Sequence, residues 1–243
     1  MLTNVMRKSS LGIGSLCLIL ATATVAVAET APDNQLTEKE KAAGWLLLFN
    51  GKNLDGWLAS DLQPGRRSAE EGAINPHKCG AYMMIHEKVW ENYQLALDFK
   101  ISPKCNSGIF LHTFPITPRL GNDVGYNGLE IAIDDTKTAG YHDTGALYDL
   151  VPPKRNAMKP VGEWNHIVIT CRGKLIDVEL NGEAVMHANL EEWTEKNKRP
   201  DGSNHKFEIA FKDKKPSGYI GLQDHGGECW FKNIKLLPLK TEK

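Results

Sequence analysis

Residues 166–185, HIVITCRGKLIDVELNGEAV, decide the fold class of this chain. Every second side chain is apolar through 167–171 and again through 176–180. A period of two is the pattern of a β-strand with one buried face. The Asn-Gly pair at 181–182 is the sequence that a tight hairpin turn prefers. The stretch therefore predicts two antiparallel strands that lead through a hairpin into a third.

The rest of the chain carries the same signal. Period-two patterns or short apolar runs mark further strands at 93–101, 109–113, 129–134, 219–223 and 229–237. Many short strands between Gly, Pro and Asn turns predict an all-β fold, a sandwich or jelly roll. One or two short helices are expected beside it. Thr37 and Glu40 form a capping box that begins a helix ending before Gly44, and 190–198 suggests a second helix.

The exported part of the chain is expected to hold one domain. Residues 29–43 read as a leader that is disordered up to residue 35, followed by the short helix. Residues 44–240 are long enough for a single β-sandwich domain. The long loops 115–126 and 151–163 are candidates for shaping a site, and the charged segment 196–215 is expected to be a surface excursion.

Residues 1–28 resemble a signal peptide. Arg7 and Lys8 form a basic start, 11–27 is apolar or small, and Ala-Val-Ala at 26–28 suits signal peptidase. A membrane anchor is the alternative, although the apolar run is shorter than the ~20 residues that span a bilayer. A lipid anchor at Cys17 is rejected because a leucine precedes it where a small residue is required. We predict a secreted or periplasmic protein with no membrane contact after cleavage.

The composition argues against a nucleic-acid partner and does not fix how the cysteines pair. The chain has 29 basic and 30 acidic residues and no basic stripe, so nucleic acid is not an expected partner. Cys79, Cys105, Cys171 and Cys229 remain after signal removal, which allows up to two disulfides in three connectivities. Cys79 and Cys105 lie just outside predicted strands, where a bridge is easily accommodated, whereas Cys171 on a buried face suits an inert thiol. No Cys-x-x-Cys spacing predicts structural zinc.

The stretch 128–135, GLEIAIDD, offers two carboxylates on one strand face. Glu130 and Asp134 are expected to point away from the core and to flank the small Ala132. Four residues along a strand span ~13 Å, whereas glycosidase carboxyls lie ~5–9.5 Å apart. The spacing therefore disfavours a standard two-carboxylate glycosidase. A solvated sheet face is the alternative interpretation of the two acids.

Histidine and tyrosine side chains add further candidates. His112 is expected to lie on the sheet face opposite the core, although a structural or exposed histidine is the more common case. Asp224 and His225 precede a Gly-Gly turn, where aspartate could orient the imidazole as a base or a metal ligand. Tyr126 and Tyr148 lie among polar residues, and such aromatic side chains suit the apolar face of a sugar ring.

Several of these stretches occur together in a recognisable order. They are LFNGKNLDGW at 48–57, NSGIF at 106–110, Glu130 with a following Asp, TGALY at 144–148, GEWN at 162–165, Asn-Gly at 181–182 and GLQDHG at 221–226. The order resembles the 3-keto-disaccharide hydrolase family and covers about 44–237. The resemblance implies a concanavalin-like jelly-roll β-sandwich in an exported bacterial protein. It also implies activity on sugars that carry a ketone at C3.

The implied chemistry needs a base, an oxyanion stabiliser and a proton donor. A C3 ketone acidifies the C2 proton, its removal gives an enolate, the C1 aglycone leaves, and added water gives net hydrolysis. On the resemblance we assign His225 as base or metal ligand oriented by Asp224, and Glu130 as a second base or ligand. His112 would stabilise the enolate, and Tyr148 would donate a proton or contact the sugar. Substrate contacts are assigned to Asn106, Asp134, Asp135, Tyr126 and Gln223. A divalent cation on Glu130 and His225 is the one cofactor expected.

The chain departs from the family pattern at two positions. His112 stands where the family often has Arg, and Ala132 stands where it often has Gln. The family's following aspartate falls on Asp135. A non-catalytic carbohydrate-binding module is therefore a second hypothesis, compatible with a sandwich and six tryptophans. Convergence of His112, Glu130 and His225 on one site would favour the enzyme.

Overall fold

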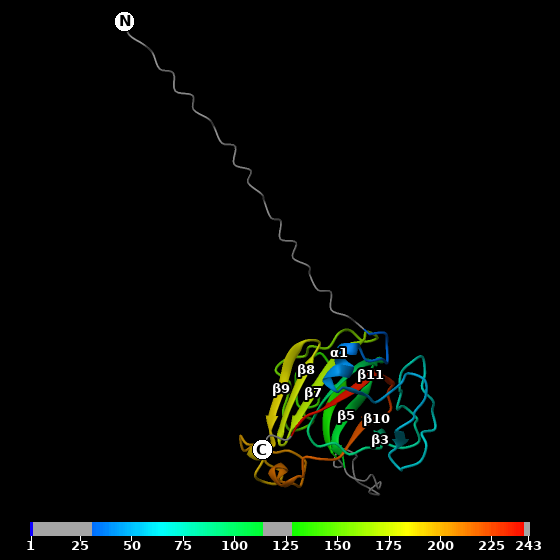
Figure 1. The fold of residues 1–243 in the computed structure, drawn as a ribbon. Helices are drawn as coiled ribbons and strands as arrows, with labels where there is room; N and C mark the ends of the chain where they lie inside the picture. The colour runs from blue at the N-terminus through cyan, green and yellow to red at the C-terminus, as the bar shows by residue number, and fades with distance from the viewer. Residues whose placement is uncertain (2–30, 114–127, 241–243) are drawn as a thin grey trace.

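The fold is a sandwich of two β-sheets, seen in a computed structural model that describes Met1 and residues 31–113 and 128–240 (Figure 1). One sheet has six strands in the order β1 (Leu46–Leu47), β11 (Cys229–Pro238), β4 (Tyr93–Ile101), β7 (Asn165–Arg172), β8 (Leu175–Leu180) and β9 (Glu183–Asn189). The other has five, in the order β2 (Trp57–Ala59), β3 (Met83–His86), β10 (Tyr219–Gln223), β5 (Asn106–Thr113) and β6 (Leu129–Asp134). The predicted all-β sandwich is confirmed.

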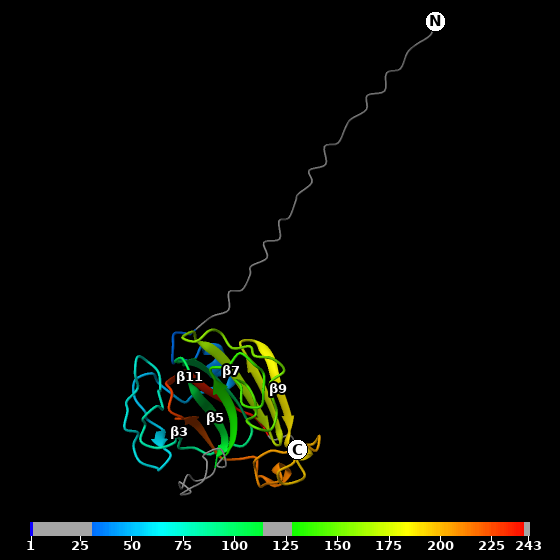
Figure 2. The same ribbon diagram turned by 180° about the vertical axis from the view of Figure 1, so that it is seen from behind.

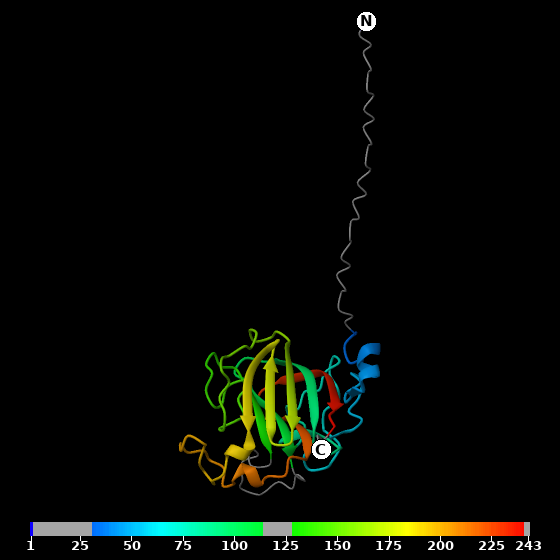
Figure 3. The ribbon, with the colours of Figure 1, turned by 60° about the vertical axis from the view of Figure 1, so that its left-hand side comes forward.

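The views place the sheets relative to each other. In Figure 3 the yellow strands β7, β8 and β9 lie side by side in front, with the green β5 behind them. From the back, β3 and β9 lie at opposite sides of the molecule (Figure 2). The core lies between the two sheets because each contributes one apolar face. In β8, Ile176, Val178 and Leu180 are buried and their neighbours are exposed, as the period-two pattern predicts.

The predicted first helix is present, and the described leader residues from 31 on are hydrogen-bonded to the domain. α1 (Glu38–Ala43) begins with the capping box of Thr37 and Glu40 and ends at Gly44 in a left-handed conformation. The expectation of a disordered leader up to residue 35 is wrong for its described part. Asn34 is buried, and its backbone N–H donates to Asn233 Oδ1 at 2.6 Å.

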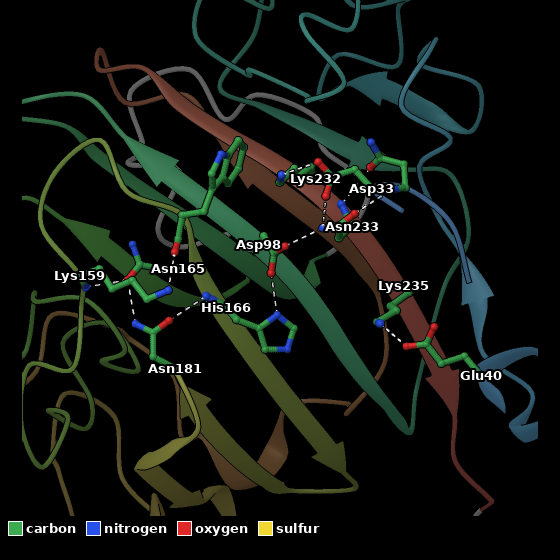
Figure 4. Close-up of polar contacts among 12 residues, drawn as sticks. Asp33, Glu40, Asp98, Lys159, Asn165, His166, Asn181, Lys232, Asn233 and Lys235 are labelled. Carbon is green, nitrogen blue, oxygen red and sulfur yellow. Dashed lines mark hydrogen bonds and ion pairs between the residues drawn. The ribbon is translucent and has the colours of Figure 1, made fainter. Parts of the chain in front are cut away.

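This N-terminal segment is fixed to β11 by side chains. The Asn34 side-chain oxygen accepts the backbone N–H of Asn233 at 2.9 Å. Figure 4 shows Lys232 beside Asp33, with 2.6 Å between nitrogen and oxygen, and Lys235 paired with Glu40 of α1. The segment before the domain therefore packs as part of the fold.

The segment after β9 differs from its prediction. Instead of a helix over 190–198, only a 3-10 turn, η2 (Leu190–Glu192), forms, followed later by η3 (Phe211–Asp213). The chain between them is not a simple surface excursion, because Trp193, Phe207 and Phe211 belong to the core. Aromatic burial at three points anchors this segment, which we call the 193–215 segment.

All four described cysteines are buried free thiols, so the disulfides expected at Cys79 and Cys105 are not present in this structure. The Cys79 thiol donates to the Ala81 carbonyl at 3.3 Å. Cys105 instead lies in hydrogen-bonding contact with Cys229. The inert thiol expected at Cys171 fits its surroundings, since burial raises its pKa to about 12.

The predicted signal peptide lies almost wholly in residues 2–30, outside the described residues. Within the described parts of the chain, no helix has the length and apolar character needed to cross a bilayer.

Candidate functional site

The five-stranded sheet carries the candidate site on its outer face. In β6, Leu129, Ile131 and Ile133 belong to the core, so Glu130 points to the other side, as predicted. An irregular segment, 144–148, extends the sheet beyond β6. There Ile131 bridges Leu147, and the Tyr148 N–H donates to the Glu130 carbonyl at 2.9 Å. Tyr148 therefore sits directly opposite Glu130.

The sheet register arranges the outer face in three rows across the strands. Residues that face one another across an antiparallel ladder share one side of the sheet. The first row is Tyr148, Glu130 and Phe110; the second is Ala146, Ala132 and Gly108; the third is Asp134 and Asn106, with His225 beside them. In the 144–148 segment, β6 and β5 the middle row is small, and on β10 the same register places Gln223 next to Gly108. The two outer rows of polar or aromatic side chains stand on either side of this strip.

Glu130 leans from the first row toward the strip. A Cβ atom on Gly108 would lie 2.7 Å from Glu130 Cγ and 2.8 Å from its Oε1. The carboxylate therefore occupies the space that the missing side chain of Gly108 leaves. Glu130 is only 7% exposed, so its charge is held in a largely desolvated position. Gly108 was not among the predicted site residues, although it lies in the NSGIF motif.

Asp134, Asn106 and His225 form a hydrogen-bonded chain in the third row. The Asn106 amide nitrogen donates to Asp134 Oδ2 at 3.1 Å, and its Oδ1 lies 2.7 Å from His225 Nδ1. Burial raises the pKa of Asp134, and the nearby carboxylates Asp143 and Asp135 raise it further. The predicted site residues Asp134, Asn106 and His225 are thus brought together.

The predicted orientation of His225 by Asp224 is wrong. Asp224 instead lies 3.2 Å from His77 Nδ1 and accepts the backbone N–H of Lys78 at 2.8 Å. It also accepts the N–H of Gly226 at 3.1 Å, which closes the turn after β10. Successive residues at the end of a strand point to opposite sides, so Asp224 and His225 take different partners.

His112 does not share the face of Glu130. Its φ of 50° lies in the left-handed region, and the β5–β10 register shifts at this point by a bulge. The bulge turns the imidazole toward Tyr93 on the opposite sheet, with 5.7 Å between ring centroids. Nε2 lies 3.2 Å from the Glu91 carbonyl, and burial lowers the His112 pKa to about 4. The prediction of His112 as an enolate stabiliser is therefore not supported by its position.

The other residues that were predicted to contact the substrate lie in different surroundings. Asp135 Oδ2 accepts the Lys104 N–H at 2.7 Å, which ties the turn before β5 to the end of β6. Gln223 is buried, and its Oε1 has no hydrogen-bond partner among the described residues. Tyr126 lies outside the described residues.

The predicted metal pair of Glu130 and His225 is not assembled. Glu130 belongs to the first row and His225 to the third, and the strand residues of those rows are ~13 Å apart. In the described residues no group of three His, Cys, Asp or Glu side chains is placed to hold a cation.

Tyr148 has neighbours that sequence reasoning left out. The His142 ring lies 4.7 Å from the Tyr148 ring, and the Lys206 ammonium lies 4.4 Å from it and 3.3 Å from the Tyr148 hydroxyl. Because the charged composition of 196–215 predicted a solvent-exposed segment, the sequence did not indicate that Lys206 contacts Tyr148. The site thus combines a buried carboxylate, a phenol, an ammonium group and a polar row around a small-residue strip.

Comparison with known proteins agrees with the architecture. A 3-keto-disaccharide hydrolase from Bacteroides thetaiotaomicron is 28% identical over 231 residues, covering 82% of this chain and 79% of the relative. Two crystal structures of proposed glycosyl hydrolases from Parabacteroides distasonis give TM-scores of 0.68 and 0.70. Their identities are 31% and 27%, and the matches cover 80% and 86% of this chain and 99% and 100% of those chains.

A family model also matches residues 44–237, the span over which the motifs ran. The resemblance drawn from the motifs is therefore confirmed. This chain belongs to the 3-keto-alpha-glucoside-1,2-lyase-like domain family.

Proposed function

We propose that this chain cleaves the glycosidic bond of 3-keto-glycosides or 3-keto-disaccharides, by elimination across C1 and C2 followed by addition of water. Family membership and the similarity to a 3-keto-disaccharide hydrolase support the substrate class. The observation that carries the proposal is the placement of Glu130, a buried carboxylate beside Tyr148 and above Gly108.

Glu130 is the base in this scheme. The sugar ring lies over the strip of Ala132 and Gly108, and the Glu130 carboxylate takes the proton from C2. The electron pair of the C2–H bond moves into the C2–C3 bond, and the ketone oxygen becomes an enolate oxygen. The low solvent exposure of Glu130 keeps bulk water away from this proton transfer.

Tyr148 supplies the second proton transfer. The enolate electrons then form a C1–C2 double bond as the C1–oxygen bond breaks. The Tyr148 hydroxyl gives its proton to the departing oxygen, and the proton held by Glu130 returns to the phenolate. The products are an unsaturated keto sugar and a free alcohol. Water added across the new double bond gives net hydrolysis.

The third row supplies contacts for the sugar. Asn106 holds His225 through Nδ1, which leaves Nε2 of the imidazole for a substrate hydroxyl. Asp134 of the same row is a further sugar contact. Gln223, which lies outside this row on β10, is another, since its Oε1 has no partner among the described residues. In this scheme His225 contacts substrate, and the role of base passes to Glu130.

Export and the cation remain part of the proposal. The signal-like residues 1–28 support action outside the cytoplasm, in the periplasm or after secretion. A divalent cation bound by carboxylate and imidazole groups would stabilise the enolate oxygen. Assaying release with and without a chelator tests whether one takes part.

The test is aglycone release from a 3-keto-glucoside by the purified chain. Wild type is expected to release the aglycone, and Glu130→Gln is expected to lower kcat/KM by at least about 100-fold, the scale of lost general base catalysis. Glu179→Gln is the matched control, because Glu179 is exposed on β8 of the other sheet. Saturable sugar binding without release would instead establish a carbohydrate-binding module, and equal activity of all three proteins would remove Glu130 from the mechanism.

A further inference from the structure

The 193–215 segment is clamped to the loop that carries Tyr148. The Arg199 guanidinium is nearly buried and lies 2.6 Å from Asp149 Oδ1. It also donates to the Asp149 carbonyl at 2.6 Å and stacks on the Tyr141 ring at 3.9 Å. A guanidinium that bonds a carboxylate and a carbonyl while stacking on an aromatic ring has a fixed position. The two segments are therefore held as one unit.

The interactions that hold Arg199 on Asp149 also position Lys206 beside Tyr148. The Lys206 N–H donates to Asp149 Oδ2 at 2.9 Å, so the same carboxylate that binds Arg199 also fixes the Lys206 backbone. From there the Lys206 ammonium reaches the Tyr148 hydroxyl at 3.3 Å and lies 4.4 Å from the ring centroid. A positive charge at this distance stabilises a phenolate more than a phenol.

Tyr148 is in turn fixed beside the base. Its backbone N–H bonds the Glu130 carbonyl at 2.9 Å, and its ring lies 4.7 Å from that of His142. Cross-strand neighbours of this kind have Cβ atoms about 5 Å apart. The order Lys206, Tyr148, Glu130 therefore runs from the 193–215 segment through the 144–148 segment to the backbone of β6.

We propose that Lys206 is a positioning residue for cleavage, whose ammonium group stabilises the Tyr148 phenolate formed when the phenol protonates the departing aglycone oxygen. The inference rests on the proposed function and adds to it a charged group that acts through Tyr148. In the step itself the Tyr148 O–H bond breaks, the proton goes to the aglycone oxygen and the negative charge stays on the phenolate. Lys206 keeps its three protons throughout.

The proposal makes the effect of Lys206 depend on the aglycone. An alkyl aglycone leaves as a strongly basic alkoxide and needs the Tyr148 proton. A 4-nitrophenyl aglycone leaves as a stable anion without one. Removing the Lys206 charge should therefore slow the first substrate and spare the second, whereas a merely structural defect would slow both.

The experiment compares methyl and 4-nitrophenyl 3-keto-glucosides with the full chain and its variants. Lys206→Met, which keeps the aliphatic stem, is expected to lower kcat/KM for the methyl glycoside by about 10- to 100-fold. It should change 4-nitrophenol release by less than about threefold, and Lys206→Arg should retain most of the activity on both because it keeps a cation. Lys212→Met is the control, since Lys212 is an exposed lysine of η3.

Each outcome of this comparison either supports or overturns the proposed role of Lys206. A selective loss on the methyl glycoside, rescued in Lys206→Arg, supports the proposal. An equal loss on both substrates, or no loss on either, overturns it while leaving the proposed function intact if wild type is active. Failure of wild type to release either aglycone would instead overturn the proposed function.

Discussion

Adding one methyl group at Gly108 is expected to displace the Glu130 carboxylate and leave the sandwich folded. The new Cβ would lie 2.7 Å from Glu130 Cγ and 2.8 Å from Oε1. Carbon atoms pack at about 3.5–4.0 Å, so the carboxylate must move by about 1 Å. A shift of that size in a reacting group costs about 100-fold in rate.

The stability effect should be much smaller. The atoms that must move are the end of a flexible side chain, so the overlap can be relieved without moving the strand. Alanine in a strand also restricts the unfolded chain more than glycine does, which favours folding by about 0.5–1 kcal/mol. We therefore expect Gly108→Ala to change the free energy of unfolding by less than about 1 kcal/mol, since part of any overpacking cost is offset.

The assay pairs urea unfolding with kcat/KM for aglycone release from a 3-keto-glucoside. Gly65→Ala is the matched control, because its Cβ would lie 2.9 Å from the flexible Met84 Cε, away from the Glu130 carboxylate. It should share the small stability change and keep wild-type activity. A folded Gly108→Ala protein with wild-type kcat/KM would refute the placement of Glu130 as the base.

Three further outcomes are expected. Lowering the pH from 7.5 to 5 should destabilise the fold, because His86 and His112 are buried with pKa values of about 4 against 6.5 when unfolded. As the pH falls, the unfolded state binds protons before the folded state does. Each of the two histidines therefore lowers the free energy of unfolding by about 2 kcal/mol at pH 5, and His112→Asn should reduce the loss measured by urea unfolding. Arg199→Leu should lower the free energy of unfolding by about 3 kcal/mol in the same measurement, since it removes the guanidinium partner of a mostly buried carboxylate. Peptide mapping after mild oxidation should find any disulfide between Cys105 and Cys229, which lie in contact.

For each of these three predictions, one result would contradict the reasoning. Unchanged stability between pH 7.5 and 5 would mean that the two histidines are not buried as neutral groups. An Arg199→Leu protein as stable as wild type would show that the 193–215 segment is held without its clamp. A disulfide-linked peptide that joins Cys79 to Cys105 would contradict the contact of Cys105 with Cys229.

The alternating strands were predictable because each has one buried face. The pattern from 166 to 180 gave β7 and β8, and the capping box at 37–40 gave α1. β3 (Met83–His86) was missed because all four residues are buried, which erases the alternation. The clamp between Arg199 and Asp149 joins residues 50 positions apart, and no local pattern announces it.

The site was predictable only where strand alternation held. Glu130 lies on the expected face, since β6 is regular. His112 was misplaced because a bulge reverses the side of the sheet. The glycine packed against the bulge, Gly218, is distant in sequence, so no local pattern at His112 marks it. The partners of His225 and Lys206 come from other strands or loops, so their pairing depends on the tertiary fold.

The most direct test of the mechanism follows the hydrogen at C2. A 3-keto-glucoside carrying deuterium at C2 is cleaved in ordinary water, and the sugar product is examined by mass spectrometry beside an enzyme-free sample that measures spontaneous exchange. Removal of the C2 proton by Glu130 predicts a product without deuterium, slower release than from the unlabelled substrate, and little release by Glu130→Gln. A product that keeps its deuterium, released at the same rate as from the unlabelled glycoside, would contradict elimination and with it the role of Glu130.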